Sequence, residues 1–329
     1  MSRTLVWIYL EPNDPDAQAF RHALEQHPDI QKRVELVFGR SNMPEAVIHE
    51  VEVFVCGGVP EGILEAAERL RWVSFWSAGL DGKLTPRLLE RGVQITNASG
   101  VHGPNIAEHV FGMMIYFTRR FDFYLRAQWA RRWERTPPKQ SPGELSGQTL
   151  GILGFGRIGE ALAWRARAFG MRVIAVKRDP SMRYDATVQP DALYGLEGLP
   201  TVLSEADHVC IALPYTEQTH HLIDRERLGQ MRPSAYLYNI ARGKIVDEAA
   251  LIEALQQGTI AGAGLDVFVE EPLPAHSPLW TMENVLITPH ISGVTPHYFE
   301  RFAKLFMVNV QRYLAGERLL NSYDPQRGY

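Results

Sequence analysis

The chain has 329 residues with a formal net charge of −4, and 45% of them are hydrophobic and 22% charged. This length suggests two domains, and the composition is that of a soluble globular protein, which excludes a disordered, collagen-like or coiled-coil chain. The charge disfavours nucleic acid and membrane surfaces as partners, and no run approaches the ~18 apolar residues of a membrane span. With only two cysteines, Cys56 and Cys210, we expect no disulfide scaffold, no metal site and a cytoplasmic location.

The first hundred residues alternate short apolar runs with helical patterns. The predicted strands are Leu5–Leu10, Val34–Phe38, Val51–Val55, Trp72–Trp76 and Val93–Asn97, and the predicted helices lie near Asp16–Gln26, Glu61–Leu70 and Pro86–Glu90. Strands rich in Val and Ile that alternate with helices indicate a parallel sheet covered on both faces. A loop over residues 98–104 then leads into one long helix, predicted from about Asn105 to Arg126, in which Met113 and Met114 are expected to pack in a core or an interface.

A second alternating series begins at Thr149. Its predicted strands are Thr149–Leu153, Arg172–Val176, His208–Leu213, Ala235–Ile240, Ala261–Val267 and Val285–Thr288. One helix is expected to start after Asp247, a good N-cap, and to end near Gly258, and the last helix runs from about Pro296 to Ala315. The sequence therefore predicts two α/β domains, one made of residues 1–100 and 296–329 and the other of residues 101–295, inserted before the last helix.

A glycine-rich turn follows the first strand of the second series. Gly154, Gly156 and Gly159 form the pattern G-x-G-x-x-G between the strand Thr149–Leu153 and a predicted helix, Glu160–Phe169. The first glycine allows the tight turn, the second lets the backbone approach a pyrophosphate, and the third lets the helix pack on the strand. The helix N-terminus offers N–H groups to the phosphates. A purely structural turn is the alternative, but the flanking strand and helix favour dinucleotide binding.

The residues after the next strand bear on the choice of dinucleotide. An acidic side chain at the end of Arg172–Val176 would bind the ribose hydroxyls of NAD, whereas this chain has Lys177 and Arg178 there and Asp179 slightly later. Two cations favour the additional phosphate of NADP. A solvated surface pair is the alternative interpretation, and NAD remains the second candidate.

Polar residues stand where several later strands end. Arg242 follows the strand Ala235–Ile240, Asp266 ends the next strand, Glu271 lies in the loop after it, and His290 follows Val285–Thr288. Ligands of open parallel sheets bind at these carboxyl ends. A His beside a carboxylate can give a proton to a carbonyl that accepts hydride, and an Arg can bind a substrate carboxylate and polarise that carbonyl.

Each of these residues also has an ordinary interpretation. Alone, His290 could be a core histidine, Arg242 a surface charge and Glu271 a loop carboxylate. Their occurrence at successive strand ends beside a dinucleotide loop favours a catalytic site. His220 and His221 lack further ligands at metal spacing and are expected to face solvent, whereas His102, His109 and His297 are expected to line the cleft or to pack.

The chain resembles the D-isomer-specific 2-hydroxyacid dehydrogenases over nearly its whole length. The resemblance rests on residues 77–81, 107–109, 154–159, 213–219, 239–247, 266–272 and 288–290. It implies two Rossmann/flavodoxin-like, doubly wound parallel-sheet domains with a cleft between them. It also implies a homodimer formed largely through the cofactor domain.

The resemblance also implies roles for particular residues. Arg242 would bind substrate, Glu271 would pair with His290, His290 would act as acid and base, and the backbone of Ala78 and Gly79 would hold the substrate carboxylate. The residues expected against or near the dinucleotide, besides the three glycines and Lys177 with Arg178, are Arg157, Ile158, Pro214, Thr219, Ile240, Ala241, Asp266 and Gly293.

The predicted activity is the reversible reduction of a small 2-keto acid to the D-2-hydroxy acid. Lys177 and Arg178 resemble the NADP-preferring glyoxylate/hydroxypyruvate reductases, and Glu271 replaces the Gln of formate dehydrogenases. Within the family, oxidation of 3-phosphoglycerate or phosphite is the alternative. A nucleotide-sensing, corepressor-like binding protein is the alternative from another class.

Overall fold

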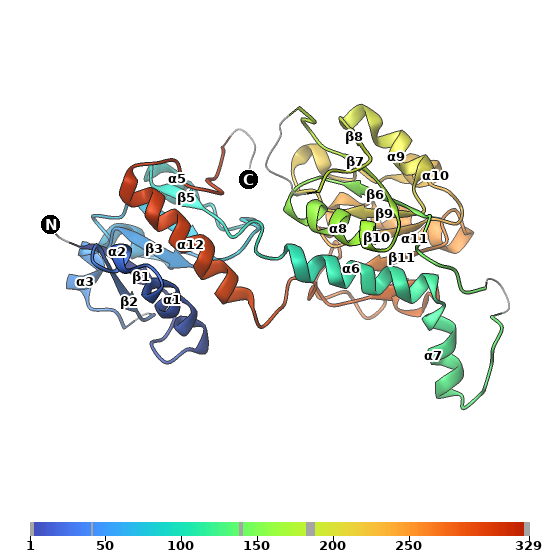
Figure 1. Cartoon of the computed structure of the whole chain (residues 1–329), viewed down its shortest axis with the longest axis horizontal. Coiled ribbons are helices and arrows are strands. Elements are labelled where there is room, and N and C mark those ends of the chain that lie inside the picture. The colour runs from blue at the N-terminus through green and yellow to red at the C-terminus, as the bar shows by residue number, and fades with distance from the viewer. Residues whose placement is uncertain (1–2, 41, 138–140, 182–187, 326–329) are drawn as a thin grey trace. The chain divides into compact units, whose positions relative to one another are not determined.

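The structure, a computed structural model, describes residues 3–40, 42–137, 141–181 and 188–325 (Figure 1). The chain divides into two compact units, Met1–His102 with Thr295–Tyr329, and Gly103–Val294. One unit contains a five-stranded sheet and the other a seven-stranded sheet, and every strand pair in both is parallel. The predicted α/β class with two parallel sheets is confirmed. Among the described residues, no helix combines the length and the apolar character needed to cross a membrane.

The first unit has the strand order β2-β1-β3-β4-β5. Its strands are β1 (Thr4–Ile8), β2 (Val34–Phe38), β3 (Val53–Cys56), β4 (Trp72–Phe75) and β5 (Gln94–Thr96). Its helices are α1 (Pro15–Glu25), α2 (Pro28–Gln31), α3 (Glu45–Glu50), α4 (Ile63–Ala66), α5 (Pro86–Glu90) and α12 (Tyr298–Ala315). Strands buried on both faces explain the continuous Val- and Ile-rich runs of the sequence.

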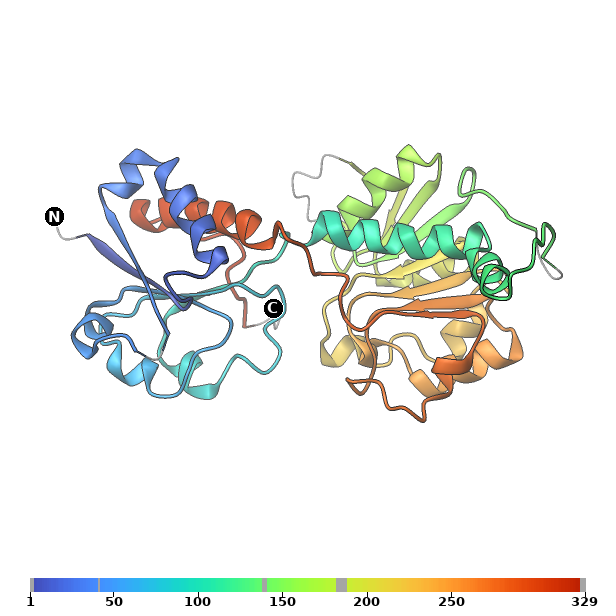
Figure 2. The same ribbon diagram turned by 90° about the horizontal axis from the view of Figure 1, so that it is seen from below.

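The last helix completes the core of this first unit. Helices α1 and α12 lie side by side on one face of the sheet, and α3, α4 and α5 lie on the other (Figure 2). The ring of Phe20 on α1 contacts Phe302 and Phe306 on α12, with centroids 5.8 and 5.9 Å apart, and Phe306 stacks on Trp72 of β4. The C-terminal helix is therefore an integral part of the unit that residues 1–102 begin.

The second unit has the strand order β12-β11-β10-β9-β6-β7-β8. Its strands are β6 (Thr149–Leu153), β7 (Arg172–Val176), β8 (Ala192–Tyr194), β9 (His208–Ile211), β10 (Tyr236–Asn239), β11 (Gly262–Leu265) and β12 (Val285–Ile287). Its helices are α6 (Gly103–Thr118), α7 (Phe121–Trp129), α8 (Arg157–Ala168), α9 (Leu199–Glu205), α10 (Arg225–Gln230) and α11 (Glu248–Gln257). Short 3₁₀ turns are η1 (Leu196–Gly198), η2 (Glu217–Thr219), η3 (Gly243–Ile245) and η4 (Pro278–Thr281).

The order of these seven strands locates a binding site. The chain runs from β6 outward to β7 and β8, then returns to the middle of the sheet and runs outward through β9 to β12 on the other side. The strand order therefore reverses between β6 and β9, and the loops after these two strands diverge. In open α/β sheets, ligands bind at the carboxyl ends of the strands at such a switch point.

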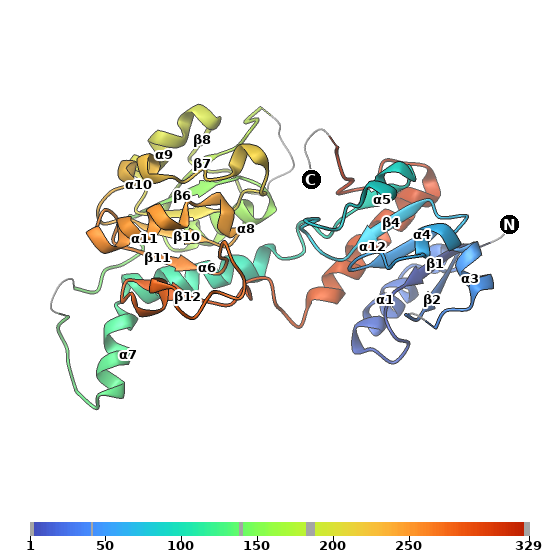
Figure 3. The same cartoon turned by 180° about the vertical axis from the view of Figure 1, so that it is seen from behind.

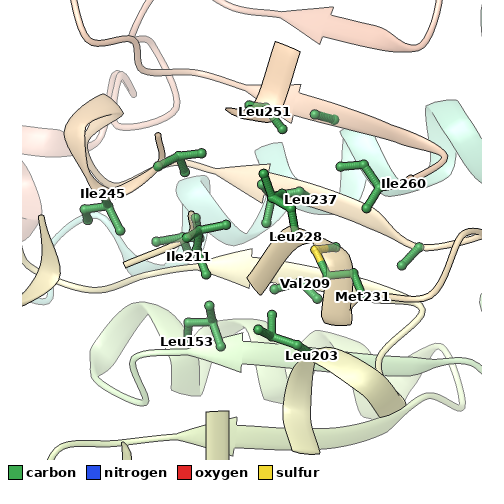
Figure 4. Close-up of a cluster of buried hydrophobic side chains, with 14 of the residues drawn as sticks. Leu153, Leu203, Val209, Ile211, Leu228, Met231, Leu237, Ile245, Leu251 and Ile260 are labelled. Atoms are coloured by element: carbon green, nitrogen blue, oxygen red, sulfur yellow. The ribbon is translucent and has the colours of Figure 1, made fainter. Parts of the chain in front are cut away.

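The core of the second unit lies on both faces of its sheet. On one face, strand residues such as Leu153, Val209 and Leu237 pack against helices α9 to α11 (Figure 4). On the other face, Met113 and Met114 of α6 are 2% and 0% exposed and pack against the strands, in line with their predicted place in a core. A close-packed sheet of this kind holds the loops at its strand ends in fixed positions.

Several element ends follow from local residue chemistry. Helix α11 starts after Asp247, whose carboxylate accepts a hydrogen bond from the backbone N–H of Ala250, and it ends at Gly258 with φ of 69°. Helix α5 starts after Thr85, whose hydroxyl accepts from the N–H of Leu88. These N-caps satisfy helix N–H groups that have no partner within the helix.

The single long helix predicted from Asn105 to Arg126 is wrong. Helix α6 ends at Thr118 and α7 begins at Phe121, because Arg120 has a left-handed backbone with φ of 59° that no helix can continue through. The guanidinium of Arg120 donates two hydrogen bonds to the nearly buried carboxylate of Asp122, which holds this turn. Apolar residues recur at helical spacing across the break, so periodicity alone did not reveal it.

Candidate active site

The first glycine of the G-x-G-x-x-G loop lies where two strands diverge. Gly154 has φ of 102°, and a Cβ placed on it would lie 2.6 Å from the carbonyl oxygen of Ala212, the residue after β9. Any side chain would therefore collide with backbone, and only glycine adopts this conformation without strain. The turn places the loop at the switch point between β6 and β9.

The other two glycines have opposite surroundings. A Cβ on Gly159 would lie 2.8 Å from the carbonyl oxygen of Gly154, so its absence lets α8 pack closely on the loop and on β6. A Cβ on Gly156 would meet nothing within 4 Å, so the protein itself does not require glycine there. The open backbone of Gly156 lies at the N-terminus of the 12-residue helix α8, where N–H groups and the helix dipole favour a phosphate. This cradle fits a dinucleotide pyrophosphate.

The residues that follow strand β7 differ in their exposure to solvent. Strand β7 ends at Val176, and the backbone N–H of the partly buried Lys177 still bonds the carbonyl of Tyr194 at 2.9 Å. Burial lowers the pKa of Lys177 from its ordinary value, and the charge of Asp179 opposes that shift. The Asp179 carboxylate accepts hydrogen bonds from the N–H and the hydroxyl of Ser181, so it folds back on its own turn. The first side chain after the strand is thus a cation.

His290 and Glu271 form a direct pair. The Nδ1 atom of His290 lies 2.7 Å from Oε2 of Glu271, and Oε1 of Glu271 accepts a hydrogen bond of 3.0 Å from the N–H of Phe268. A carboxylate only accepts hydrogen bonds, so Nδ1 of His290 carries a proton and Nε2 is the nitrogen left for another partner. The imidazole is 49% exposed, which makes it accessible to a substrate.

A buried carboxylate holds the loop that carries His290. Asp266, at 0% exposure, accepts hydrogen bonds from the Thr288 hydroxyl, the Ile291 N–H and the Ser292 N–H. Its backbone carbonyl accepts the N–H of His290 at 2.8 Å, and His290 has φ of 53°, which is uncommon for a residue with a side chain. The structure thus shows Asp266 as the support of this loop, and its contact with a dinucleotide stays a prediction.

Arg242 lies on a turn that a buried amide holds in place. The Asn239 side chain, 1% exposed, donates to the carbonyl of Arg242 and accepts the N–H of Ala241. Gly243 packs so tightly against the backbone of Phe268 that a Cβ would overlap it. Phe268 in turn donates to Glu271, so the Arg242 turn and the His290–Glu271 pair are built on adjoining backbone. Sequence reasoning did not give Asn239 this supporting role.

The remaining predicted dinucleotide residues lie in the same unit. The hydroxyl of Thr219 donates to the carbonyl of Pro214 at 2.9 Å and accepts the N–H of Thr216, which fixes the loop after β9. Arg157 and Ile158 begin α8, with Arg157 59% exposed. Ile240 and Ala241 follow β10 and are buried, and Gly293 follows Ser292 and is partly exposed.

Ala78 and Gly79 belong to the other unit, in the loop after β4. Both are partly buried, and the Ser77 hydroxyl donates to the carbonyl of Gly79 at 2.9 Å. The ammonium of Lys83 donates to the Ser77 hydroxyl at 2.6 Å, which brings a cation to this loop. Sequence reasoning missed Lys83 because nothing in the pattern links it to Ser77 across the intervening turn.

Four of the other histidines differ in their surroundings. His220 and His221 are exposed and stack on each other with ring centroids 3.9 Å apart, as predicted for residues facing solvent. His102 stacks on Tyr298 at 4.7 Å. His109 contacts the Thr288 hydroxyl at 3.0 Å, beside Asp266. Among the described residues, no three His, Cys, Asp or Glu side chains are grouped to hold a metal ion.

Comparison with known proteins agrees with this arrangement. Residues 111–292 match the family model described as D-isomer specific 2-hydroxyacid dehydrogenase, NAD binding domain. A glyoxylate reductase of Pyrococcus furiosus is 40% identical over 264 residues, which are 79% of this chain and 77% of that protein. Glyoxylate/hydroxypyruvate reductase B of Yersinia pestis is 38% identical over 293 residues, 87% of this chain and 88% of that protein.

A solved structure extends the likeness to the whole fold. A D-isomer specific 2-hydroxyacid dehydrogenase from Xanthobacter autotrophicus Py2, crystallised with NADPH and MES, aligns over 100% of both chains with a TM-score of 0.81 and 32% identity. The family match covers more than half of the chain and includes the glycine loop, Arg242, Glu271 and His290. The chain therefore belongs to the D-isomer-specific 2-hydroxyacid dehydrogenases and is an NAD(P)-dependent enzyme of that family.

Proposed function

We propose that this enzyme reduces a small 2-keto acid of the glyoxylate or hydroxypyruvate type to the D-2-hydroxy acid, with His290 as the proton donor. The observation that carries the proposal is the 2.7 Å contact between Nδ1 of His290 and Oε2 of Glu271, which leaves Nε2 available for a substrate. The substrate class is supported by relatives named glyoxylate reductase and glyoxylate/hydroxypyruvate reductase.

In this proposal the proton and the substrate are handled by this chain's own residues. A nicotinamide dinucleotide, when bound, supplies the hydride that adds to the carbonyl carbon. His290 gives its Nε2 proton to the carbonyl oxygen, which becomes the hydroxyl, and takes that proton back in the reverse direction. The negative charge of Glu271 stabilises the protonated imidazole before transfer and keeps the ring in one orientation.

Arg242 is proposed to hold the substrate. Its planar guanidinium can bind the carboxylate through two parallel hydrogen bonds and polarise the adjacent carbonyl. The backbone N–H groups of Ala78 and Gly79, in the loop where Lys83 contacts Ser77, are proposed to bind a substrate carboxylate. Asn239 supports this role, because its hydrogen bonds hold the backbone of the turn that carries Arg242 in one position.

We propose that NADP(H) is preferred over NAD(H). The first residue after β7 is Lys177, followed by Arg178, and the Asp179 carboxylate is engaged by Ser181. A 2′-phosphate at this strand end would accept charge-assisted hydrogen bonds and offset the cost of burying Lys177. The Xanthobacter relative that aligns over the whole chain was crystallised with NADPH.

A substrate and cofactor panel tests these proposals. Glyoxylate, hydroxypyruvate and pyruvate are each assayed with NADPH and NADH, and the configuration of the reduced hydroxypyruvate is determined by chiral chromatography. We expect D-glycerate and a kcat/KM for NADPH roughly tenfold or more above that for NADH, since a hydrogen bond to a charged group contributes about 1.5–3 kcal/mol. The double variant Lys177→Asp, Arg178→Ala is expected to reverse this ratio.

Other outcomes of the panel would contradict the proposal. An NADH preference in the unmodified protein would show that Lys177 and Arg178 are a solvated surface pair. Turnover of 3-phosphoglycerate or phosphite with no reduction of any 2-keto acid would assign the enzyme to a different substrate class. Tight dinucleotide binding without any turnover would favour a nucleotide-sensing role instead.

We further propose that the chain forms a homodimer through the second unit. Helix α7 projects from the body of that unit (Figure 3). Trp129 and Trp133, on and just after this helix, are 76% and 95% exposed, and Phe121 at its start is 46% exposed. Aromatic side chains gathered on one exposed segment are typical of a protein interface.

A further inference from the structure

Two polar side chains of α6 reach the loop that carries His290. Asn105 and His109 are four residues apart, so they lie on the same face of the helix, one turn from each other. The Asn105 amide donates to the carbonyl of Ser292 at 2.8 Å, and Nε2 of His109 lies 3.0 Å from the Thr288 hydroxyl. These contacts fall on either side of His290, two residues before it and two residues after it.

The hydrogen bonds define where the protons are. The Thr288 hydroxyl has one proton, and it donates this proton to the Asp266 carboxylate at 2.6 Å. The hydroxyl oxygen can therefore only accept from His109, so His109 carries its proton on Nε2. The result is a directed chain from His109 through Thr288 to a carboxylate that is 0% exposed.

The carboxylate at the end of this hydrogen-bond chain fixes the backbone conformation around His290. The same Asp266 carboxylate accepts the N–H groups of Ile291 and Ser292, the two residues that follow His290. His290 itself has φ of 53°, a conformation that persists only where the surroundings impose it. Asp266 and α6 together supply those surroundings, because they fix the residues immediately before and after the strained position.

We propose that Asn105 and His109, here called the α6 clamp, position His290 for proton transfer. Neither residue needs to touch the substrate. They hold Thr288 and Ser292 in place. This fixes the orientation of the His290 imidazole relative to Glu271 and to the carbonyl oxygen of the substrate. This inference rests on the proposed role of His290, and it adds that a helix outside the strand ends sets the geometry of the reaction.

The first test breaks the hydrogen-bond chain from His109 to Asp266 at two points. His109→Leu deletes the donor, and Thr288→Val deletes the hydroxyl while keeping the shape of the side chain. A displacement of ~1 Å can lower a rate on the order of 10²-fold, so we expect kcat to fall roughly tenfold or more in each variant. The double variant should be no slower than the slower single variant, because both remove the same chain. His109→Gln, which keeps an N–H donor, should recover most of the rate.

Two further measurements separate positioning from loss of stability. The pH above which the reduction rate falls should be lower in His109→Leu, because a looser contact with Glu271 stabilises the protonated imidazole of His290 less. In the protein without ligands, the NMR titration midpoint of the His290 ring should move in the same direction. The affinity for NADPH, measured by fluorescence quenching, should stay within about twofold.

A matched control is available in the same unit. His208, at the start of β9 and 2% exposed, is hydrogen-bonded to Gln148 and Tyr238 at the end of the sheet opposite the strand ends that carry the site. His208→Leu should lower the melting temperature but leave kcat and the pH profile unchanged. If His109→Leu behaves in the same way, with a lower melting temperature and normal kinetics, the clamp proposal is wrong.

The outcomes also distinguish the clamp from the proposed function. If His290→Ala keeps its turnover, the assignment of His290 fails. If His290→Ala is inactive while His109→Leu and Thr288→Val have normal kcat and an unmoved His290 titration, only the clamp fails. Should His109→Leu not fold, the same readouts on Thr288→Val, which conserves volume, decide the question.

Discussion

The imidazole of His290 has one nitrogen committed and one available. Nδ1 is held by Glu271, which is itself held by the N–H of Phe268, so the ring has a defined tautomer before any ligand arrives. The side chain is half-exposed, so Nε2 can then exchange a proton with a substrate without reorganising the contact at Nδ1. At the residue scale, the proposed chemistry depends on the hydrogen bond at Nδ1, because it determines the tautomer of the ring and leaves Nε2 to react.

Replacing His290 by Ala should remove the proton donor. We expect turnover of the 2-keto acid to fall by roughly 10²–10⁴-fold, the usual contribution of general acid catalysis, while NADPH binding changes little. Glu271→Gln should instead keep the ring in place but remove the charge that stabilises its protonated form, so the pH above which reduction slows should be lower. Steady-state kinetics from pH 5 to 9 measure both. Normal turnover in His290→Ala would contradict the assignment.

Arg242 should not tolerate a change to Lys. Lys keeps the positive charge but lacks the planar fork that binds a carboxylate with two hydrogen bonds. We therefore expect a higher KM for the 2-keto acid and a lower kcat, with kcat/KM reduced by roughly one to two orders of magnitude, about the contribution of the one hydrogen bond to a charged group that Lys cannot replace. The matched control is Arg225→Lys, a surface arginine paired with Glu253, which should leave the kinetics unchanged. Equal kcat/KM in Arg242→Lys and the parent would exclude Arg242 from the reaction centre.

At the scale of an element, β9 begins with a histidine that must stay neutral. His208 bonds Oε1 of Gln148 through Nε2 and the Tyr238 hydroxyl through Nδ1, so a ring with a single proton satisfies both partners. Burial lowers the pKa of His208 from 6.5 to about 4, and the nearby charge of Asp207 only partly opposes this. In the unfolded chain the same ring would have its ordinary pKa.

This difference predicts an acid-sensitive second unit. Between pH 6.5 and pH 4 the unfolded chain binds a proton at His208 that the folded protein does not, so stability is present above pH 6.5 and is lost as the pH falls. At pH 5 the loss amounts to about 2 kcal/mol. His208→Gln, which cannot titrate, should show a shallower fall in melting temperature between pH 7.5 and pH 5. The exposed His276 gives the control His276→Gln, and equal slopes in the parent and His208→Gln would contradict the prediction.

The elements also show what a single sequence can and cannot predict. Apolar runs predicted β6 and β7 to the residue, and the capping chemistry of Asp247 and Gly258 predicted both ends of α11. The break between α6 and α7 depends on a backbone torsion at Arg120 that apolar spacing does not encode. The strand β8 was not predicted from the sequence.

The residues of the candidate site also divide into those that local sequence patterns indicate and those that only the fold brings together. Arg242, Glu271 and His290 could be proposed because strand ends converge and their chemistry is distinctive. His109 was left undecided, because its partner Thr288 is 179 residues away and only the packing of α6 on the sheet brings them together. Asp266 could be placed at a strand end, but its three hydrogen bonds to the His290 loop depend on the fold of that loop.

At the scale of the whole molecule, the assembly of two chains can be tested through α7. If the aromatic residues of this helix form the interface, the double variant Trp129→Ser, Trp133→Ser should weaken the dimer by two orders of magnitude or more, since interface Trp residues contribute ~2 kcal/mol or more each. Sedimentation velocity over a range of protein concentrations measures this. Trp280→Ser, which removes another half-exposed tryptophan, is the control. A parent protein that is monomeric at all concentrations would contradict the dimer.

The surroundings of the three loop glycines bear on how the cofactor preference of this enzyme could be engineered. A Cβ at position 154 would collide with backbone, and a Cβ at position 159 would collide with backbone and crowd core side chains. Substitutions at these two positions therefore disturb the fold itself, before any dinucleotide is present. Position 156 meets nothing, so a small side chain there leaves the empty protein intact and is felt only by what binds. A mutational library for this enzyme should therefore keep 154 and 159 constant. Position 156 can be varied, because a loss of activity on substitution there reports ligand recognition rather than folding.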